Sequence, residues 1–219
     1  MAWRKRKPSD SVGRLSFLED SMSRIGEVLR GFPVIGALRS SNTKDLREGD
    51  LRFCSVYFIL EGDIFEARRI VALADDSVAF FLHLDLFGGI APDEAGFLLL
   101  RELFPRVRGI ISTRARTLTL ARRMEFITIF RLFCIDSESL RTGLKVIQEV
   151  GPDAVEVLPG IVFPKICRFL PLEGFPPVIC GGFIRTPKDV RDILKSGALA
   201  VSTSAKDLWK MNEALKECR

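Results

Sequence analysis

Short apolar runs alternate with helix-forming segments along most of this chain, and this alternation constrains its fold more than any other feature. The runs are continuous, as in strands buried on both faces of a parallel sheet. Eight of them begin at Val34, Phe53, Ser77, Gly109, Phe126, Ala154, Pro177 and Ala198. Helices are expected at roughly 43–48, 62–73, 93–103, 117–124, 137–149, 163–169, 187–195 and 205–217. Eight such units in 219 residues predict a compact (β/α)8 barrel of the TIM type, smaller than the ~250 residues usual for that fold.

Two of these helices carry clear start signals. Asp136 and Thr186 each place a capping side chain before the first turn, and Pro187 follows Thr186 at the first helical position. We therefore expect helices to begin directly after both residues.

Residues 1–32 form an extension outside the barrel pattern, and 33–219 form the barrel domain. The basic tail Trp3–Lys7 precedes an apolar seam with the spacing of an amphipathic helix, made of Leu15, Leu18, Met22, Ile25 and Leu29. Such a helix can plug the N-terminal mouth of the barrel or provide the contact of a homodimer, and the pattern leaves both open.

Composition and cysteine use indicate a protein of the cytoplasm with no membrane partner. The longest apolar run, Val78–Leu82, is far shorter than the roughly 20 residues of a membrane helix. The charged N-terminal segment is unlike a secretion signal. Five cysteines without metal-ligand spacing are typical of buried thiols in a reducing compartment, so no metal or cofactor is expected.

Positive charge is concentrated in one segment of a chain with a net charge of +5. The range 101–123 carries seven arginines and one glutamate. A concentrated basic region favours a polyanionic partner such as RNA, although a solvated basic face or pairing with acidic residues of a neighbour explains it equally well. The candidate RNA-contacting residues are Arg106, Arg108, Arg114, Arg116, Arg122 and Arg123.

Small residues follow the last two predicted strands, where a barrel commonly binds phosphate on backbone amides. Gly181 and Gly182 allow close approach of the backbone, and three hydroxyl residues precede the last helix. The alternative is that the glycines only turn the chain and the hydroxyls only cap a helix. The predicted phosphate-binding residues are Gly181, Gly182, Ser202, Thr203 and Ser204.

Polar side chains also interrupt the apolar runs toward the same end of the barrel. A buried polar group without a partner costs about 1 to 3 kcal/mol, so each of these side chains needs one. Arg131 and Glu156 lie on neighbouring strands and form either a buried ion pair or part of a ligand site, or both. The candidates for binding a polyol group beside the phosphate are Asp85, Ser112, Arg131, Glu156 and Lys165, although Lys165 fits a surface position equally well.

Six motifs together resemble the glycerol-uptake operon antiterminator regulatory proteins, from about Val34 to Met211. They are His83–Gly89, Gly109–Thr113, Phe130–Ser137, Val155–Gly160, Gly181–Thr186, and Ser202–Ser204 with Leu208–Trp209. The resemblance implies a β/α barrel that responds to glycerol 3-phosphate, binds leader mRNA of glycerol-catabolism operons and lets transcription pass a terminator. Arg114 and Arg116 stand where family members more often carry lysine.

Two other function classes remain open from the residues themselves. A small phosphate-binding barrel enzyme acting on a triose or polyol phosphate is one, with Asp85 and Glu156 as base and acid. A degenerate barrel serving as a dimeric interaction module is the other. The sequence contains no nucleophile beside a base and no dinucleotide-binding fingerprint, and its single histidine, His83, fits a core position better than a catalytic one. We therefore expect a binding protein that is not an enzyme.

Overall fold

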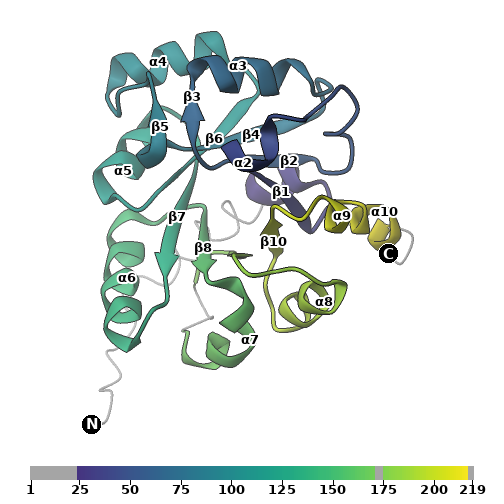
Figure 1. The fold of residues 1–219 in the computed structure, drawn as a ribbon. Helices are drawn as coiled ribbons and strands as arrows, with labels where there is room; N and C mark the ends of the chain where they lie inside the picture. The colour runs from purple at the N-terminus through teal and green to yellow at the C-terminus, as the bar shows by residue number, and fades with distance from the viewer. Residues whose placement is uncertain (1–23, 171–174, 217–219) are drawn as a thin grey trace.

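The computed structural model describes residues 24–170 and 175–216. Eight parallel strands close into a barrel in the order β1-β10-β9-β8-β7-β6-β4-β2 (Figure 1). The strands are β1 (Val34–Leu38), β2 (Val56–Ile59), β4 (Ala79–His83), β6 (Val107–Ser112), β7 (Ile127–Phe133), β8 (Ala154–Leu158), β9 (Val178–Gly181) and β10 (Ala200–Thr203). The predicted (β/α)8 barrel is confirmed.

Helices surround this barrel, and seven of the eight predicted helical segments overlap at least one, the exception being 43–48, of which only Thr43 is helical. They are α2 (Ser40–Thr43), α3 (Ile64–Ala72), α4 (Glu94–Leu103), α5 (Ala115–Arg123), α6 (Ser137–Val150), α7 (Phe163–Ile166), α8 (Pro187–Lys195), α9 (Lys206–Trp209) and α10 (Met211–Lys216). Both predicted caps are confirmed: the Asp136 side chain accepts from Ser139 N, and Thr186 accepts from Asp189 N.

The structure differs from the sequence prediction in four places. The predicted helix 43–48 was wrong: the helical turn lies earlier, at Ser40–Thr43, because the Asn42 side chain accepts from the backbone N–H of Arg39 and closes the turn there. The segment 163–169 divides into α7 and the 3-10 helix η3 (Cys167–Phe169), and 205–217 divides into α9 and α10. A small sheet outside the barrel pairs β3 (Gly62–Asp63) with β5 (Phe87–Gly88).

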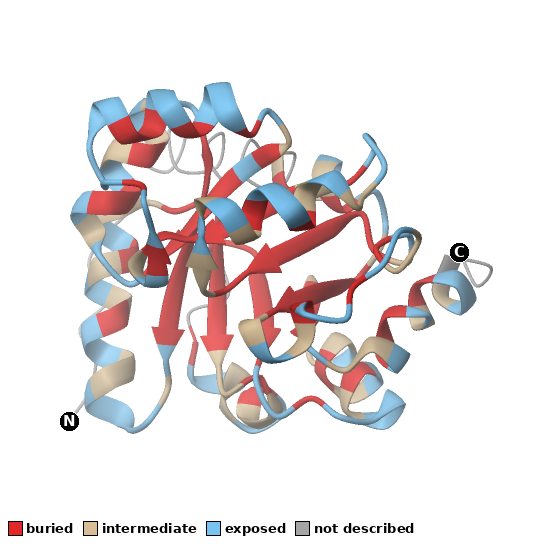
Figure 2. Ribbon diagram, turned by 45° about the horizontal axis from the view of Figure 1, so that its top comes forward, coloured by how far each residue is buried: buried red, intermediate tan, exposed pale blue. Residues whose placement is uncertain are grey.

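The strands separate two apolar layers. Alternate residues such as Ile35, Phe58 and Ile129 fill the barrel interior, while Leu38, Tyr57 and others pack outward against the helices. Figure 2 shows buried strands within a ring of helices that are exposed on their outer sides. At the end of the barrel interior where the strands finish, polar residues such as Arg131, Glu156 and Ser202 take the place of apolar ones.

The other end of the barrel is closed by the helical turns at residues 24–29. Ile25 and Leu29 are buried in the same apolar cluster as the interior strand residues. The Ser55 hydroxyl donates to Leu29 O at 2.7 Å, and Arg24 lies 3.0 Å from Asp153 in an ion pair. This packing confirms that Ile25 and Leu29 plug the N-terminal mouth of the barrel. The rest of the predicted seam, Leu15, Leu18 and Met22, lies outside the described residues.

The last helices seal the junction of the first and last strands. The side chain of Asn212, fully buried, accepts from Val34 N at 3.0 Å and donates to Val34 O at 2.8 Å. Trp209 donates its indole N–H to Thr203 O at 2.8 Å and packs edge-on against Tyr57. Within the described part of the chain, no helix is long and apolar enough to cross a membrane.

Candidate functional site

A cavity of about 730 Å³ opens at the ends of the barrel strands where their loops begin. This is the end at which barrels of this kind place their ligand sites. Residues from four strands, β1, β7, β8 and β10, and from the loops after β1, β2, β8, β9 and β10 form its walls. They are Ala37, Arg39, Leu60, Arg131, Phe133, Glu156, Leu158, Pro159, Gly182, Phe183, Ile184, Arg185, Ser202, Thr203, Ser204 and Ala205.

A buried ion pair forms the floor of the cavity. Arg131 of β7 and Glu156 of β8 are direct partners in the parallel register, so both side chains point into the barrel. Arg131 Nε donates to Glu156 Oε2 at 2.8 Å, and Ser202 Oγ donates to Glu156 Oε1 at 2.7 Å. Both carboxylate oxygens are therefore occupied. Arg131 Nη2 lies 2.7 Å from Oε2 but without the geometry of a hydrogen bond, which leaves this buried nitrogen with donors for a ligand.

The Gly-Gly loop after β9 is required by close packing and by backbone conformation. A Cβ on Gly181 would lie 2.5 Å from Ser202 Oγ and 2.7 Å from Glu156 Oε1, so only glycine fits above the ion pair. Gly182 has φ +87°, which L side chains rarely adopt, and its backbone lines the cavity. Gly181 thus packs against the side chains of the floor, and Gly182 is part of the cavity wall.

The three hydroxyl residues after β10 have different environments. Ser202 is bonded to Glu156, and Thr203 Oγ1 donates to Ile184 O at 2.9 Å, which holds the loop after β9 against β10. Ser204 is exposed on the cavity wall. Of the hydroxyls predicted to bind phosphate, the one on Ser204 is the best placed to meet a ligand directly.

Two arginines that the sequence reasoning missed also line the cavity. Arg39 follows β1 and lies 3.3 Å from Glu61, with its side chain about half exposed. Arg185 follows β9, is exposed, and has no ion pair among the described residues. Arg39 directly follows the last residue of β1, and Arg185 comes four residues after the end of β9, in the loop before α8; these positions in the loops after strands were the available signal. Together they give the cavity mouth a positive charge suited to a phosphate.

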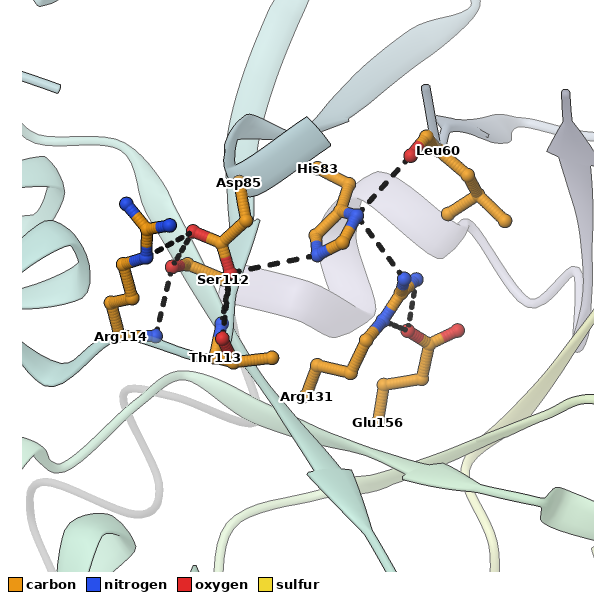
Figure 3. Close-up of polar contacts among 8 residues, drawn as sticks. All are labelled: Leu60, His83, Asp85, Ser112, Thr113, Arg114, Arg131 and Glu156. Atoms are coloured by element: carbon orange, nitrogen blue, oxygen red, sulfur yellow. Dashed lines mark hydrogen bonds and ion pairs between the residues drawn. The ribbon is translucent and has the colours of Figure 1, made fainter. Parts of the chain in front are cut away.

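Asp85 and Ser112 are absent from the cavity walls. Figure 3 shows them together with Thr113 and Arg114. Asp85 lies in the 3-10 helix η1 (Leu84–Leu86), past the end of β4. Its carboxylate accepts from Ser112 Oγ at 2.7 Å, from Thr113 N at 2.7 Å and from Thr113 Oγ1 at 2.8 Å. Burial acts to raise the pKa of Asp85, but His83 and these hydrogen bonds outweigh it and hold the pKa well below its usual value.

His83 joins this carboxylate to the cavity floor. The ring is buried inside the barrel, with Nε2 3.7 Å from Asp85 Oδ2. Its Nδ1 lies 3.2 Å from Leu60 O and 3.3 Å from Arg131 Nη1 (Figure 3). A ring nitrogen either donates to the carbonyl or accepts from the guanidinium, so only one of these contacts is a hydrogen bond at a time. The contacts run without a gap from Arg131 through His83 and Asp85 to the start of α5.

The remaining predicted polyol residue, Lys165, is exposed on α7 and is absent from the cavity walls. Its position agrees with the surface alternative that the sequence left open.

The arginines of the range 101–123 do not form one face. Arg106 donates to Ala74 O at 2.6 Å and to Asp75 O at 2.7 Å, and Arg122 donates to Gly151 O at 2.8 Å. These two guanidinium groups hold loops together. The others of the predicted set are exposed, but they stand at opposite ends of β6 and α5: Arg108 and Arg123 at one end, Arg114 and Arg116 at the other.

The model of the glycerol-3-phosphate responsive antiterminator family matches residues 34–209 of this chain. The chain belongs to this family. The matched range begins at the first residue of β1 and ends at the last residue of α9, so family membership covers the whole barrel.

Individual relatives agree with this assignment. A glycerol uptake operon antiterminator regulatory protein from Listeria monocytogenes is 32% identical, with a TM-score of 0.63 over 81% of this chain and 94% of that one. A glycerol uptake operon antiterminator-related protein from Thermotoga maritima is 31% identical, with a TM-score of 0.67 over 81% of this chain and 98% of that one. The uncharacterized protein YgcP of Escherichia coli is 32% identical over 86% of this chain and 97% of its own length.

Proposed function

We propose that this protein binds glycerol 3-phosphate in the barrel cavity and, in response, binds leader mRNA of glycerol-catabolism operons so that transcription passes a terminator. The observation that supports it most is the cavity itself, which combines a buried polar floor with a cationic mouth in a chain of the antiterminator family.

The chemistry of the walls suits both ends of this ligand. Arg39, Arg185 and the Ser204 hydroxyl surround the mouth, where a phosphate dianion gains charge-assisted hydrogen bonds. Arg131 Nη2 at the floor is ion-paired with Glu156 but makes no hydrogen bond among the described residues, so it has donors to offer to the glycerol hydroxyls. A volume of about 730 Å³ lies within the ordinary range for small-molecule sites, which is roughly 300 to 1,000 Å³.

Binding without turnover is the simpler interpretation of this cavity. None of the described residues that line it is a lysine, a cysteine or a histidine. Glu156, the only carboxylate among the described residues of the walls, has both oxygens occupied by Arg131 and Ser202. A general base must reach the proton that it removes, and this carboxylate is not free to do so. Loss of glycerol 3-phosphate during prolonged incubation with the protein would instead favour the enzyme alternative.

Calorimetry with two matched glycine variants tests the effector site. Gly182→Val places a branched side chain on the cavity wall at φ +87°, and Gly197→Val introduces the same backbone strain at φ +95°, away from the cavity and with nothing within 4 Å of a Cβ. Only Gly182→Val should abolish binding of glycerol 3-phosphate. Unchanged affinity in a folded Gly182→Val protein would refute the assigned site.

RNA binding needs its own measurement. Leader transcripts of the source organism's glycerol operons should bind more tightly in the presence of glycerol 3-phosphate than in its absence, as followed by fluorescence anisotropy. A readthrough assay with purified RNA polymerase then tests antitermination. Equal RNA binding with and without the effector would contradict the proposed response.

The basic segment predicted from the sequence is tested with Arg116→Ala and Arg123→Ala together. Removing two phosphate contacts should reduce the salt slope of log K by about 1.4 for single-stranded RNA. Arg123 already lies 3.5 Å from Glu94 in an exposed ion pair, which competes with such a contact. An unchanged slope would place the RNA surface elsewhere on the molecule.

A further inference from the structure

Two phenylalanines stand exposed on the rim of the effector cavity. Phe133 at the end of β7 is 46% exposed, and Phe183 in the loop after β9 is 70% exposed. Both contribute to the cavity walls, although Phe is a residue type that folding usually buries. Exposed aromatic rings at one site of a folded protein call for a partner that covers them.

Phe183 is held in this position by its own backbone. It has φ +58°, an uncommon conformation for a residue with a bulky side chain, and it lies between Gly182 and the buried Ile184. Thr203 Oγ1 fixes the loop by donating to Ile184 O. Strain that the surroundings maintain in this way is typical of functional positions.

Positive charge surrounds the two rings. Three arginines line the cavity against one glutamate, and that glutamate is bonded to Arg131. Arg39 is paired with Glu61, so the net positive charge of the mouth comes from Arg185, which has no ion pair among the residues that the structure describes. This combination of stacking surfaces and guanidinium groups is complementary to bases and phosphates.

The rim continues past Phe133 toward α5. A second, shallower depression of about 490 Å³ shares Arg131 and Phe133 with the cavity and reaches Thr113. Arg114 follows there with its side chain 64% exposed and its Nε 3.8 Å from Asp85 Oδ1, and a hydrogen bond to Asp85 fixes the backbone of Thr113 beside it. A single nucleic-acid strand that crossed the cavity mouth from Arg185 to Arg114 would pass Phe183 and Phe133.

We propose that this rim, made of Phe133, Phe183, Arg39, Arg185 and Arg114, binds single-stranded leader RNA by stacking unpaired bases on the two phenylalanines. The inference rests on the proposed antiterminator function and locates its RNA surface directly over the effector. Sequence-specific RNA recognition usually takes unstacked bases against aromatic rings. The basic segment 101–123 supplies no such exposed ring, and two of its six candidate arginines hold loops together.

This location explains how an effector in the cavity controls RNA binding. Gly182 contacts the ligand space, and Phe183 is the next residue in the chain. A ligand against the Gly182 backbone adds a contact to the loop that presents Phe183, and so stabilises the arrangement of the rim to which RNA binds. The coupling is reciprocal, and RNA should raise the affinity for glycerol 3-phosphate by the same factor.

Substitutions that separate stacking from apolar bulk test the proposal. Phe183→Leu keeps an apolar side chain without an aromatic face, Phe183→Trp keeps a face, and Phe169→Leu is the control at a phenylalanine that is 62% exposed but does not line the cavity. Anisotropy uses a short fluorescein-labelled single-stranded RNA of mixed sequence and, separately, the leader transcript. Calorimetry on each variant sets the concentration of glycerol 3-phosphate at which the protein is saturated.

At saturating effector, Phe183→Leu should weaken RNA binding by roughly 5- to 150-fold, the range for loss of one stacked base. Phe183→Trp and Phe169→Leu should bind RNA within about 3-fold of the wild type, which is under 1 kcal/mol. Equal binding by Phe183→Leu and wild type overturns the proposal while the antiterminator function stands. A loss of effector affinity in Phe183→Leu that leaves RNA binding at saturation unchanged overturns it too, and makes Phe183 a cover for the ligand. Failure of the wild type to bind either RNA overturns both proposals.

Discussion

The buried pair of Arg131 and Glu156 offers the sharpest test of how the barrel floor works. Their side chains are 3% and 1% exposed, and Arg131 Nε donates to Glu156 Oε2 at 2.8 Å. Glu156→Gln keeps the shape and one acceptor oxygen, but removes the charge that balances the guanidinium. Hydrogen bonds to charged groups contribute about 1.5 to 3 kcal/mol, so unfolding should become easier by that amount. For a domain of this size the melting temperature should fall by about 3 to 12 °C.

A double variant separates the structural part of this effect from the ligand part. Replacing both partners of a buried ion pair by apolar residues of similar volume is often neutral or stabilising, whereas removing one partner leaves an unpaired charge. Arg131→Met with Glu156→Met should therefore recover the melting temperature that Glu156→Gln loses, while it fails to bind glycerol 3-phosphate. Differential scanning calorimetry and ligand titration on the same preparations give both readouts.

The ligand specificity of Glu156→Gln tests what the floor recognises. Glu156 holds Arg131 in place, so weakening this charge-assisted bond should reduce glycerol 3-phosphate binding by roughly 10- to 150-fold, and inorganic phosphate binding much less. An equal loss for both ligands would show that the floor does not sense the glycerol hydroxyls. A melting temperature within 1 °C of the wild type would refute the energetic role of the pair.

Three further perturbations test the packing and the polar network. Asp85→Asn should lower the free energy of unfolding by about 1.5 to 3 kcal/mol at pH 7. Folding lowers the pKa of Asp85. The contribution of the Asp85 carboxylate to stability is therefore complete above the unfolded pKa of about 3.9 and declines as the pH falls toward the folded pKa. The difference between wild type and variant in urea titrations should therefore narrow below about pH 4, and a constant difference would argue against the assigned bonds. Gly36→Ala places a Cβ 2.2 Å from the buried ring of Tyr57 and should destabilise the protein by about 1 to 3 kcal/mol. Gly26→Ala, with nothing within 4 Å of the added Cβ, should instead stabilise the protein through its helix by about 0.5 to 1 kcal/mol. A change of melting temperature in the same direction for both variants would contradict this packing. Burial raises the pKa of Cys54 to about 12 and that of Cys180 well above its usual value. After treatment with iodoacetamide, mass spectrometry should therefore find both thiols unmodified until the protein unfolds. Rapid labelling of either thiol in the native protein would refute their burial.

Features that depend on neighbouring positions along the chain could be predicted from the sequence. The apolar runs gave all eight barrel strands, since a strand buried on both faces needs a continuous apolar segment. The caps at Asp136 and Thr186 lie within three residues of the amides that they bind. Arg131 and Glu156 could be paired because adjacent parallel strands keep their residues in register.

Features that depend on segments far apart in the chain were decided by the tertiary structure alone. Arg39 and Arg185 meet at one cavity only because the barrel closes β1 against β10, with β9 beside it. Arg106 and Arg122 look like free charges in the sequence, yet carbonyls of loops after other elements accept their hydrogen bonds. The exposed face of Phe183 is equally hidden in the sequence, where Gly-Gly-Phe-Ile continues an apolar run. The patterns of single segments thus determined that a barrel forms and where its mouth lies, while the closure of the barrel determined which side chains stand together at that mouth.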